Sequence, residues 1–176
     1  IFPDQMKLAK VVPIYKSGDS TSVNNYRPIS ILPSFSKILE KIVAKRLMKF
    51  LEKNNLIYTH QYGFRPKHST IHPIIHLLND IASENDKPTK NTTLGIFLDI
   101  TKAFDSVNHK LLIQKLEKYG IRGPPLDWFK SYLSGRAQYT QFDKYYSNTK
   151  QIKYGVPQGS VLGPILFLLY INDIHE

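Results

Sequence analysis

The longest apolar run of the chain, Val161 to Ile171, is too short for a membrane-spanning helix and is interrupted by Gly163 and Pro164. A helix that crosses a bilayer needs about 20 consecutive apolar residues. The run follows the tetrapeptide Pro157-Gln158-Gly159-Ser160, whose proline, glycine and serine are typical of a helix start. We therefore expect a helix that begins within this tetrapeptide and ends at about residue 172, and we expect no membrane partner.

Strands and helices alternate irregularly along the rest of the chain, and this order predicts the α+β class. Short apolar runs between turn residues indicate strands over residues 8–14, 25–32 and 94–100, and a hairpin that pairs 136–142 with 151–156. Apolar residues at three- and four-residue steps indicate helices over residues 34–51, 70–82, 109–119 and 125–134. Residues 85–91 are expected to form a polar linker, and Ser34 is expected to cap the first helix.

Each of the first two helices is expected to pack one apolar face inward. In the first helix this face comprises Ile38, Leu39, Ile42, Val43, Leu47, Phe50 and Leu51. In the second helix it comprises Ile71, Ile74, Ile75, Leu78 and Ile81. The remainder of the first helix is rich in lysine, which indicates either a solvated face or a surface for an anionic partner.

The charge balance favours a nucleic-acid partner. The chain has 24 Lys and Arg against 14 Asp and Glu, a formal net charge of +10. Its 176 residues suit one domain, and 41% hydrophobic residues are enough to bury a core. The absence of cysteine excludes disulfides, thiolate metal sites and a cysteine nucleophile, and fits an intracellular location. The chain starts with Ile1 and has no secretory signal pattern, so we interpret it as part of a longer protein.

Asp99 is the residue whose position is most informative about chemistry. It ends the apolar run 94–100, and a carboxylate there is costly to bury unless it is paired or binds a metal. Mg²⁺ takes oxygen ligands, and it commonly bridges one or two carboxylates to substrate phosphates. Asp99 is therefore either a Mg²⁺ ligand or an ordinary turn residue. Asp105 follows six residues later and is expected to cap the next helix, with metal binding as its second interpretation.

Two further groups of residues suit phosphate or nucleotide binding. Gln158 offers both donor and acceptor groups at an expected helix start, and Gly155 and Gly159 permit close approach of the backbone to a ligand. Lys16 and Arg27 flank a polar turn, and the planar fork of Arg27 matches a phosphate. Taken singly, each group also has an ordinary explanation, as a helix cap or as surface cations.

Four motifs in order, together with residues 170–174, resemble one family. They are Tyr26-Arg27-Pro28-Ile29-Ser30, Gln61-Tyr62-Gly63-Phe64-Arg65, the run from Leu98 to Val107, and Gly155-Val156-Pro157-Gln158-Gly159-Ser160. Together they resemble the reverse transcriptase domain of non-LTR, LINE-like retrotransposons of the jockey type, over essentially the whole chain. Group II intron enzymes are less similar. The resemblance implies a right-hand polymerase fold without its thumb. Residues up to about 93 would be fingers and about 94–176 the start of the palm, with a finger-like excursion near 110–155.

The resemblance also implies site residues, partners and a cofactor. It implies an RNA-directed DNA polymerase that uses an RNA template, a DNA primer, deoxynucleoside triphosphates and Mg²⁺ or Mn²⁺, in the nucleus and cytoplasm. The implied residues are catalytic and metal-binding Asp99, the carbonyl of Ile100 as a further metal ligand, nucleotide-binding Arg27, Lys16, Phe104, Gln158 and Gly159, and template-contacting Gly63, Phe64 and Arg65. Phe104 would be the steric gate that rejects a ribose 2′-OH.

The family's adjacent pair of aspartates is missing from these residues. No Asp-Asp dipeptide occurs in the chain, and Asp173 is expected to be a helix-end residue. We therefore expect that the chain by itself does not polymerise. Two alternatives stay open: a non-catalytic nucleic-acid-binding remnant of such a domain, and a basic α+β domain with chance motifs. His72 and His76 are four residues apart on an expected helix, and we interpret them as surface or core histidines.

Overall fold

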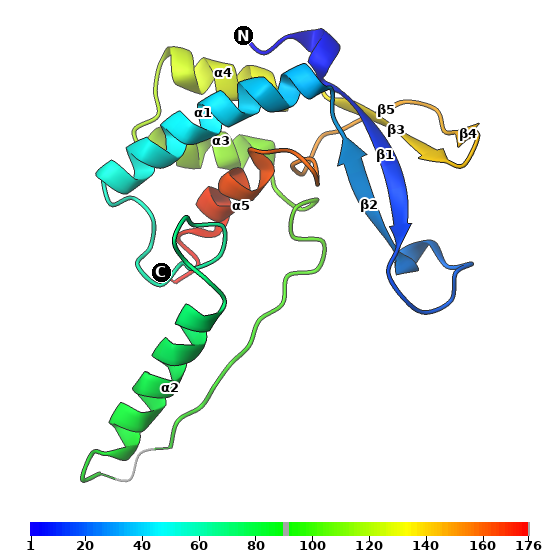
Figure 1. The fold of residues 1–176 in the computed structure, drawn as a ribbon. Coiled ribbons are helices and arrows are strands. Elements are labelled where there is room, and N and C mark those ends of the chain that lie inside the picture. Colours follow the sequence, from blue (N-terminus) through cyan, green and yellow to red (C-terminus); the bar gives the residue numbers. More distant parts are fainter. Residues whose placement is uncertain (90–91, 176) are drawn as a thin grey trace.

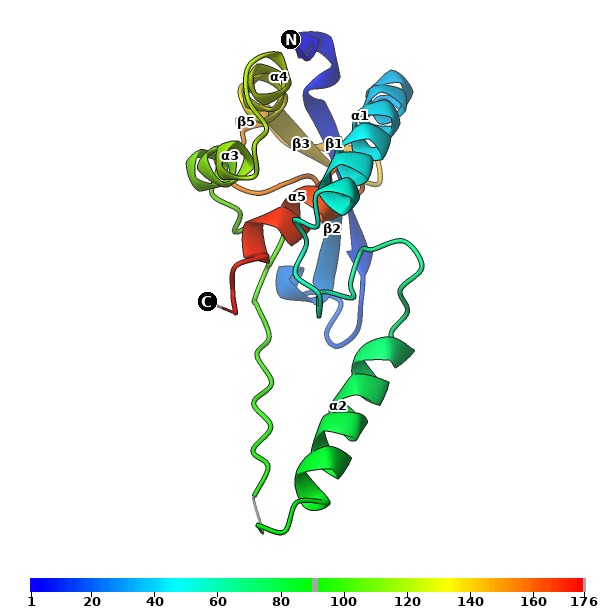
Figure 2. The same ribbon diagram turned by 90° about the vertical axis from the view of Figure 1, so that its left-hand side faces the viewer.

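The computed structural model describes residues 1–89 and 92–175, so Lys90 and Asn91 of the expected linker lie outside the described residues. A sheet lies beside four of the helices, and α2 (Ile71–Asn85) projects from this body together with the extended segment that follows it (Figures 1 and 2). The expected mixture of helices and strands is confirmed.

The sheet joins segments from opposite ends of the chain. Its order is β2-β1-β3-β4, with β5 also paired to β3; the strands are β1 (Leu8–Tyr15), β2 (Tyr26–Ile31), β3 (Ala137–Phe142), β4 (Tyr145–Tyr146) and β5 (Lys150–Gln151). The central strand β1 pairs antiparallel with β2 and parallel with β3. The first two strands were predicted, but the second arm of the predicted hairpin is shorter than expected and is divided between β4 and β5.

Four helices enclose the core: α1 (Ser34–Lys53), α3 (His109–Lys118), α4 (Pro124–Leu133) and α5 (Gly163–Ile171). Leu162, Leu166, Leu168 and Leu169 in and next to α5 are fully buried. A helix that is apolar on all sides must lie inside the protein, because it has no face that water solvates well. The apolar run that is too short for a membrane is thus the centre of the core. Two short 3₁₀ helices, Asp4–Met6 and Val23–Asn25, complete the body.

The buried face of α1 differs from the predicted apolar face. Its fully or nearly buried residues are Ser36, Glu40, Ala44, Leu47 and Leu51, whereas Ile38 and Ile42 are 53% and 49% exposed. Ser34 is the first helical residue and not the cap, because Pro33 occupies the cap position and makes no side-chain capping bond. Because the buried face of α1 differs from the predicted one, Glu40 is turned toward the start of α5, where backbone amides need a hydrogen-bond acceptor.

Glu40 caps α5 from another helix. One carboxylate oxygen of Glu40 accepts hydrogen bonds from the amides of Val161 (2.7 Å) and Leu162 (3.2 Å), and the other accepts one from the Ser36 hydroxyl (2.9 Å). The Ser160 hydroxyl accepts a bond from the amide of Gly163. The predicted helix start within residues 157–160 was therefore wrong: α5 begins at Gly163, and the amides at its start are bonded within the protein rather than open to an anion.

Tyr132 on α4 is buried beside Glu40 and Arg136. Its hydroxyl makes no hydrogen bond within the described residues, and the Arg136 guanidinium lies 4.9 Å from its ring centroid. Burial raises the pKa of Tyr132 above its usual range, the Glu40 carboxylate raises it further, and Arg136 opposes the shift. Tyr132 is therefore neutral in the folded protein at pH values where an unfolded tyrosine ionises, so it stabilises the fold below about pH 10 and this contribution is lost as the pH rises.

We expect Tyr132→Phe to change the stability at pH 7 by no more than about 1 kcal/mol, because it removes a hydroxyl that is buried without a partner. Above about pH 10 the variant should lose stability less steeply than the parent, because it lacks the ionisation that favours unfolding. Urea unfolding at pH 7 and above pH 10 measures both effects. A loss of several kcal/mol at pH 7 would show that the hydroxyl is bonded.

The helix predicted over residues 70–82 is confirmed as α2, but the prediction that its apolar face packs inward was wrong, and so was the strand predicted over residues 94–100. Ile71, Ile74, Ile75 and Leu78 are exposed rather than turned inward. Residues 94–100 form no strand, and Leu94, Phe97 and Leu98 are more than 80% exposed. An apolar run can become a buried strand only if another strand bonds its backbone, and no described strand pairs with this segment. Both elements project from the body (Figure 2), and their exposed apolar side chains form a large uncovered surface.

None of the helices in the described ranges combines the length and apolar composition needed to cross a bilayer.

Candidate functional site

Two of the sequence motifs meet where residues 104–108 run antiparallel to residues 154–156. The amide of Gly155 donates to the carbonyl of Val107 (2.7 Å), and the amide of Val156 donates to that of Phe104 (2.8 Å). Asn108 and Tyr154 form an isolated bridge in the same pairing. These bonds hold the segment after Asp99 against the segment that leads into Gln158.

Gly155 and Gly159 are required by the protein's own backbone. Both have positive φ, at +85° and +119°. A Cβ on Gly155 would lie 2.8 Å from Cα of Asp105, and a Cβ on Gly159 would lie 2.5 Å from the carbonyl oxygen of Ser30. The amide of Ser30 donates to the carbonyl of Gln158 (2.7 Å), which fixes Gln158 beside β2. The close neighbours of these two glycines within the protein are β2 and the segment around Asp105, and the approach of a ligand to their backbone stays a prediction.

We expect Gly159→Ala to destabilise the chain by about 2–3 kcal/mol, because a rigid carbonyl cannot move away as a flexible side chain could. Gly120→Ala is the matched control, since Gly120 also has positive φ (+88°) at the end of α3, but a Cβ there would meet only the Phe50 ring at 3.7 Å, an ordinary contact. The control should cost about 1 kcal/mol, from backbone strain alone. Urea unfolding followed by circular dichroism compares the two variants. Equal losses of stability in the two variants would show that the contact of the added Cβ with the Ser30 carbonyl does not destabilise the protein.

Gln158 bonds directly to Asp105. Its side-chain amide donates to both carboxylate oxygens of Asp105 at 3.2 Å. The two residues line a cavity of about 180 Å³ together with Pro28, Ser30 and Tyr154. The expectation that Asp105 caps the next helix was wrong, because Asn108 is the cap and accepts a bond from the amide of Leu111. Asp105 instead orients the amide of Gln158 at the edge of this cavity.

Phe104 connects this junction to the Gly63-Phe64-Arg65 motif. Its half-buried ring lies edge-on to the ring of Phe64, with centroids 5.9 Å apart, and 5.0 Å from the ring of Phe167 in α5. Phe64 has a positive φ of 59°, and Arg65 donates to the carbonyls of Tyr58 and Gln61, so the motif forms a compact turn. Residues 63–65 were predicted to contact the template and Phe104 to bind the nucleotide, and the structure brings Phe64 and Phe104 together.

Arg27 and Lys16 lie at the far end of the β1–β2 hairpin. Arg27 is exposed on β2 opposite Ile14, and Lys16 directly follows β1 with its amide bonded to the carbonyl of Asn25. Side chains alternate along a strand, so Arg27 is on the face of β2 opposite to Pro28 and Ser30. Arg27 directly precedes Pro28, which lines the cavity, but neither Arg27 nor Lys16 is among the lining residues.

Asp99 and Ile100 lie at the end of the extended segment 94–100, and Asp99 is exposed. No group of three or more histidine, aspartate or glutamate side chains among residues 1–89 and 92–175 is arranged to hold a metal ion. One exposed carboxylate with a neighbouring carbonyl does not by itself make a Mg²⁺ site, since the ion takes octahedral oxygen ligands. The residues described here therefore do not suffice for the implied metal.

Asp173, His72 and His76, which the sequence predicts to be structural residues, make contacts within the protein. Lys115 on α3 donates to the Asp173 carboxylate, and this hydrogen bond lowers the pKa of Asp173. His72 accepts a bond from the amide of Ser69 at the start of α2 (2.9 Å), and His76 lies near the rings of His60 and Tyr62. Sequence reasoning missed Glu40, although a carboxylate in line with Ala44, Leu47 and Leu51 at helical spacing was a signal of it.

The comparisons with known proteins agree with these motifs. Residues 14–176 match the family described as Reverse transcriptase (RNA-dependent DNA polymerase). The match covers most of the chain, so the chain belongs to the reverse transcriptase family.

Its relatives include proteins of mobile elements from Drosophila melanogaster. It is 38% identical over 176 residues to the probable RNA-directed DNA polymerase from transposon X-element, and this alignment covers 99% of the chain and 19% of the relative. It is 37% identical to the corresponding protein from transposon BS and 38% identical to the RNA-directed DNA polymerase from mobile element jockey, each over 98% of the chain and 19% of the relative. The resemblance to jockey-type elements is confirmed, and the chain spans about a fifth of these relatives.

Proposed function

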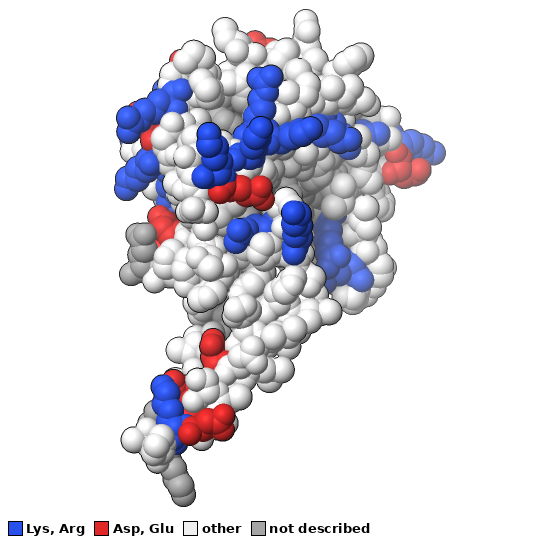
Figure 3. Space-filling view, turned by 60° about the vertical axis from the view of Figure 1, so that its left-hand side comes forward, with Lys and Arg blue, Asp and Glu red and all other residues white. Residues whose placement is uncertain are grey.

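We propose that this chain is part of an RNA-directed DNA polymerase that adds deoxynucleotides to a primer 3′-OH. The observation that carries the proposal is the junction of Phe104, Asp105 and Gln158 beside β2. An amide held by a carboxylate at a cavity edge is a fixed polar group that can meet a nucleotide sugar, and the ring of Phe104, the residue before Asp105, is proposed to restrict the space for a 2′-OH. The basic surface suits an RNA template and a DNA primer (Figure 3).

The division into fingers (about 1–93) and palm (about 94–176, with an excursion near 110–155) is part of this proposal. The uncovered apolar surface of residues 94–100 supports an incomplete palm, because a polymerase palm would bury it under further strands. The free backbone of residues 94–100 is suited to pair with such strands. In this proposal the completed sheet makes the right-hand fold and turns residues 94–100 into the buried strand that the sequence predicts.

Lys16 and Arg27 are proposed to neutralise the triphosphate. Both are exposed, and neither belongs to an ion pair among the described residues. The guanidinium of Arg27 is well suited to a phosphate because it presents paired donors. Gly63, Phe64 and Arg65 are proposed to contact the template, which agrees with the exposure of Phe64 next to Phe104.

Mg²⁺, or Mn²⁺ in its place, is the proposed cofactor. Asp99 and the carbonyl of Ile100 would supply ligands, and a further carboxylate is proposed to complete the site, since no group of three or more potential ligand side chains occurs among the described residues. When bound, the ion supplies charge stabilisation to the phosphoryl group that is transferred.

The proposal predicts that Phe104→Ala, in a longer protein that contains these residues and the following palm segment, lowers discrimination against ribonucleotides by at least about tenfold. A pocket that excludes a group by steric contact loses roughly this much when the contact is removed. Primer extension with matched deoxy- and ribonucleotides measures the ratio. Phe35→Ala is the control, because Phe35 is an exposed phenylalanine at the start of α1 with no proposed role at the site.

Unchanged discrimination by Phe104→Ala would contradict the assigned role. Salt-sensitive binding of an RNA–DNA hybrid without extension by the longer protein would instead favour the alternative of a non-catalytic nucleic-acid-binding remnant.

A further inference from the structure

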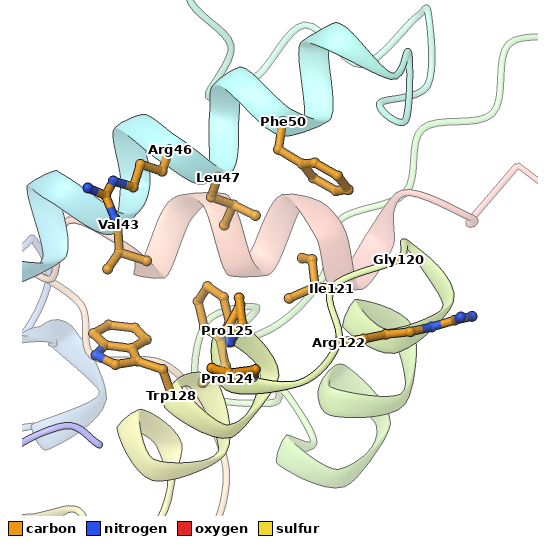
Figure 4. A pocket seen from close by; sticks show the side chains of 11 residues that line it. Val43, Arg46, Leu47, Phe50, Gly120, Ile121, Arg122, Pro124, Pro125 and Trp128 are labelled. Carbon is orange, nitrogen blue, oxygen red and sulfur yellow. The ribbon is translucent and has the colours of Figure 1, made fainter.

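A cavity of about 590 Å³ opens between α1 and the start of α4, and it shares no residue with the cavity at Gln158 (Figure 4). One wall is formed by Val43, Leu47 and Phe50 of α1, and the other by Ile121, Pro125 and Trp128. Leu47 and Ile121 also belong to the buried core, so the floor of this groove is the core itself. We call it the α1–α4 groove.

The turn between α3 and α4 keeps the groove open. At the end of α3 the amide of Gly120 donates to the carbonyl of Glu117, and the amide of Ile121 donates to that of Leu116, both at 3.0 Å. These bonds turn the chain sharply and direct Ile121 toward α1 (Figure 4). Pro124 and Pro125 then begin α4, where their fixed φ angles stiffen the second wall. The groove is therefore a feature of rigid elements rather than of a loop that could close over it.

The charged groups that line the groove are of one sign. Arg46 comes from α1 and Arg122 from the turn, both are exposed, and no aspartate or glutamate is in the lining. Neither arginine takes part in the ion pairs found within the described part of the chain. An apolar slot with an unpaired cation on each side is complementary to a segment that combines apolar side chains with carboxylates.

We propose that the α1–α4 groove docks an acidic amphipathic helix of a partner protein. Its apolar side chains would fill the space above Leu47 and Ile121, and its carboxylates would pair with Arg46 and Arg122. A nucleic acid fits less well, because the bases would lose water against Val43, Leu47 and Ile121 without polar groups to bond their edges. A second copy of this chain fits less well, since each copy carries a formal charge of +10.

The experiment uses the chain with two fluorescein-labelled helical peptides of equal length. Both carry leucine and phenylalanine on one face, and their other positions are glutamate in the first peptide and lysine in the second. We expect the glutamate peptide to bind at least about tenfold more tightly by fluorescence anisotropy, as two complementary ion pairs over an apolar contact would give. The double variant Arg46→Glu/Arg122→Glu should weaken the glutamate peptide by about tenfold and strengthen the lysine peptide.

Lys41→Glu/Lys45→Glu is the matched control. These exposed lysines are on α1 outside the groove, and each double variant lowers the formal net charge from +10 to +6, since each reversal removes two charges. The control should bind the glutamate peptide like the parent. Equal weakening by both variants would overturn the proposal, because it would show attraction by net charge alone. Equal binding of the two peptides would also overturn the proposal. So would displacement of the glutamate peptide by a single-stranded oligonucleotide. Self-association of the chain that the Arg46→Glu/Arg122→Glu variant abolishes would overturn it as well.

Discussion

Glu40→Ala is expected to lower the free energy of unfolding by about 3 kcal/mol or more. The change deletes three hydrogen bonds of a fully buried carboxylate, those from Val161, Leu162 and Ser36. Bonds to a charged group stabilise more than neutral ones, and the part-buried amide of Val161 and the buried amide of Leu162 would be left without an acceptor. Because α5 is the centre of the core, the loss of its cap should affect the whole body rather than one helix end.

Urea unfolding of the chain, followed by circular dichroism, measures this loss. Glu52→Ala is the control, since Glu52 is an exposed carboxylate on the same helix and should change stability by less than about 0.5 kcal/mol. Glu40→Gln keeps an acceptor oxygen for the amides and should fall between the two. A Glu40→Ala protein as stable as the parent would show that α5 does not depend on this carboxylate.

Asp99→Asn is expected to reduce primer extension about a thousandfold in the longer protein in which we place this chain. A metal ligand contributes several kcal/mol of charge stabilisation to the transferred phosphoryl group, which corresponds to a change of this size. The stability of the chain of residues 1–176 by itself should not change, because Asp99 is exposed there on a segment without strand partners. The loss should therefore appear in the rate and not in the unfolding curve.

Asp80→Asn is the matched control, because Asp80 is an exposed carboxylate on α2 and should keep the parent rate. Titration with Mn²⁺ adds a second readout, since a variant that lacks a metal ligand should need a higher concentration of the ion. Full activity of Asp99→Asn would remove Asp99 from the site and leave the family match without its expected chemistry.

The elements that sequence reasoning predicted well are those whose signals are local. The strands of the N-terminal hairpin and the helices α1, α3 and α4 follow from periodicity and from turn residues within each segment. The parallel pairing of Leu8 with Ala137 has no local signal, because it depends on how the whole chain is arranged. Residues 94–100 carry the pattern of a buried strand, but a strand needs a partner, and no described segment supplies one.

The candidate site shows the same limit. The order of the motifs, through the family resemblance, was enough to predict Phe104 and Gln158 as site residues, and the structure brings the segments that carry them to one junction. It could not show that Asp105 bonds Gln158 instead of capping a helix, since Asn108 three residues later suits the cap equally well by residue type. Nor could it show that Gly155 and Gly159 accommodate Asp105 and Ser30, because close contacts between distant segments depend on tertiary packing.

The arrangement of the sheet has a consequence for synthesis on the ribosome. The strand β1 lies between β2, which follows it closely, and β3, which emerges only after α1 to α4 have been made. At the usual rates of translation, roughly ten seconds pass between the synthesis of β1 and the synthesis of β3, and one edge of β1 has no partner strand during this time. During that time the edge can pair with other nascent chains, so the yield of folded protein should depend on how fast residues 16–136 are translated and on chaperones that cover the edge.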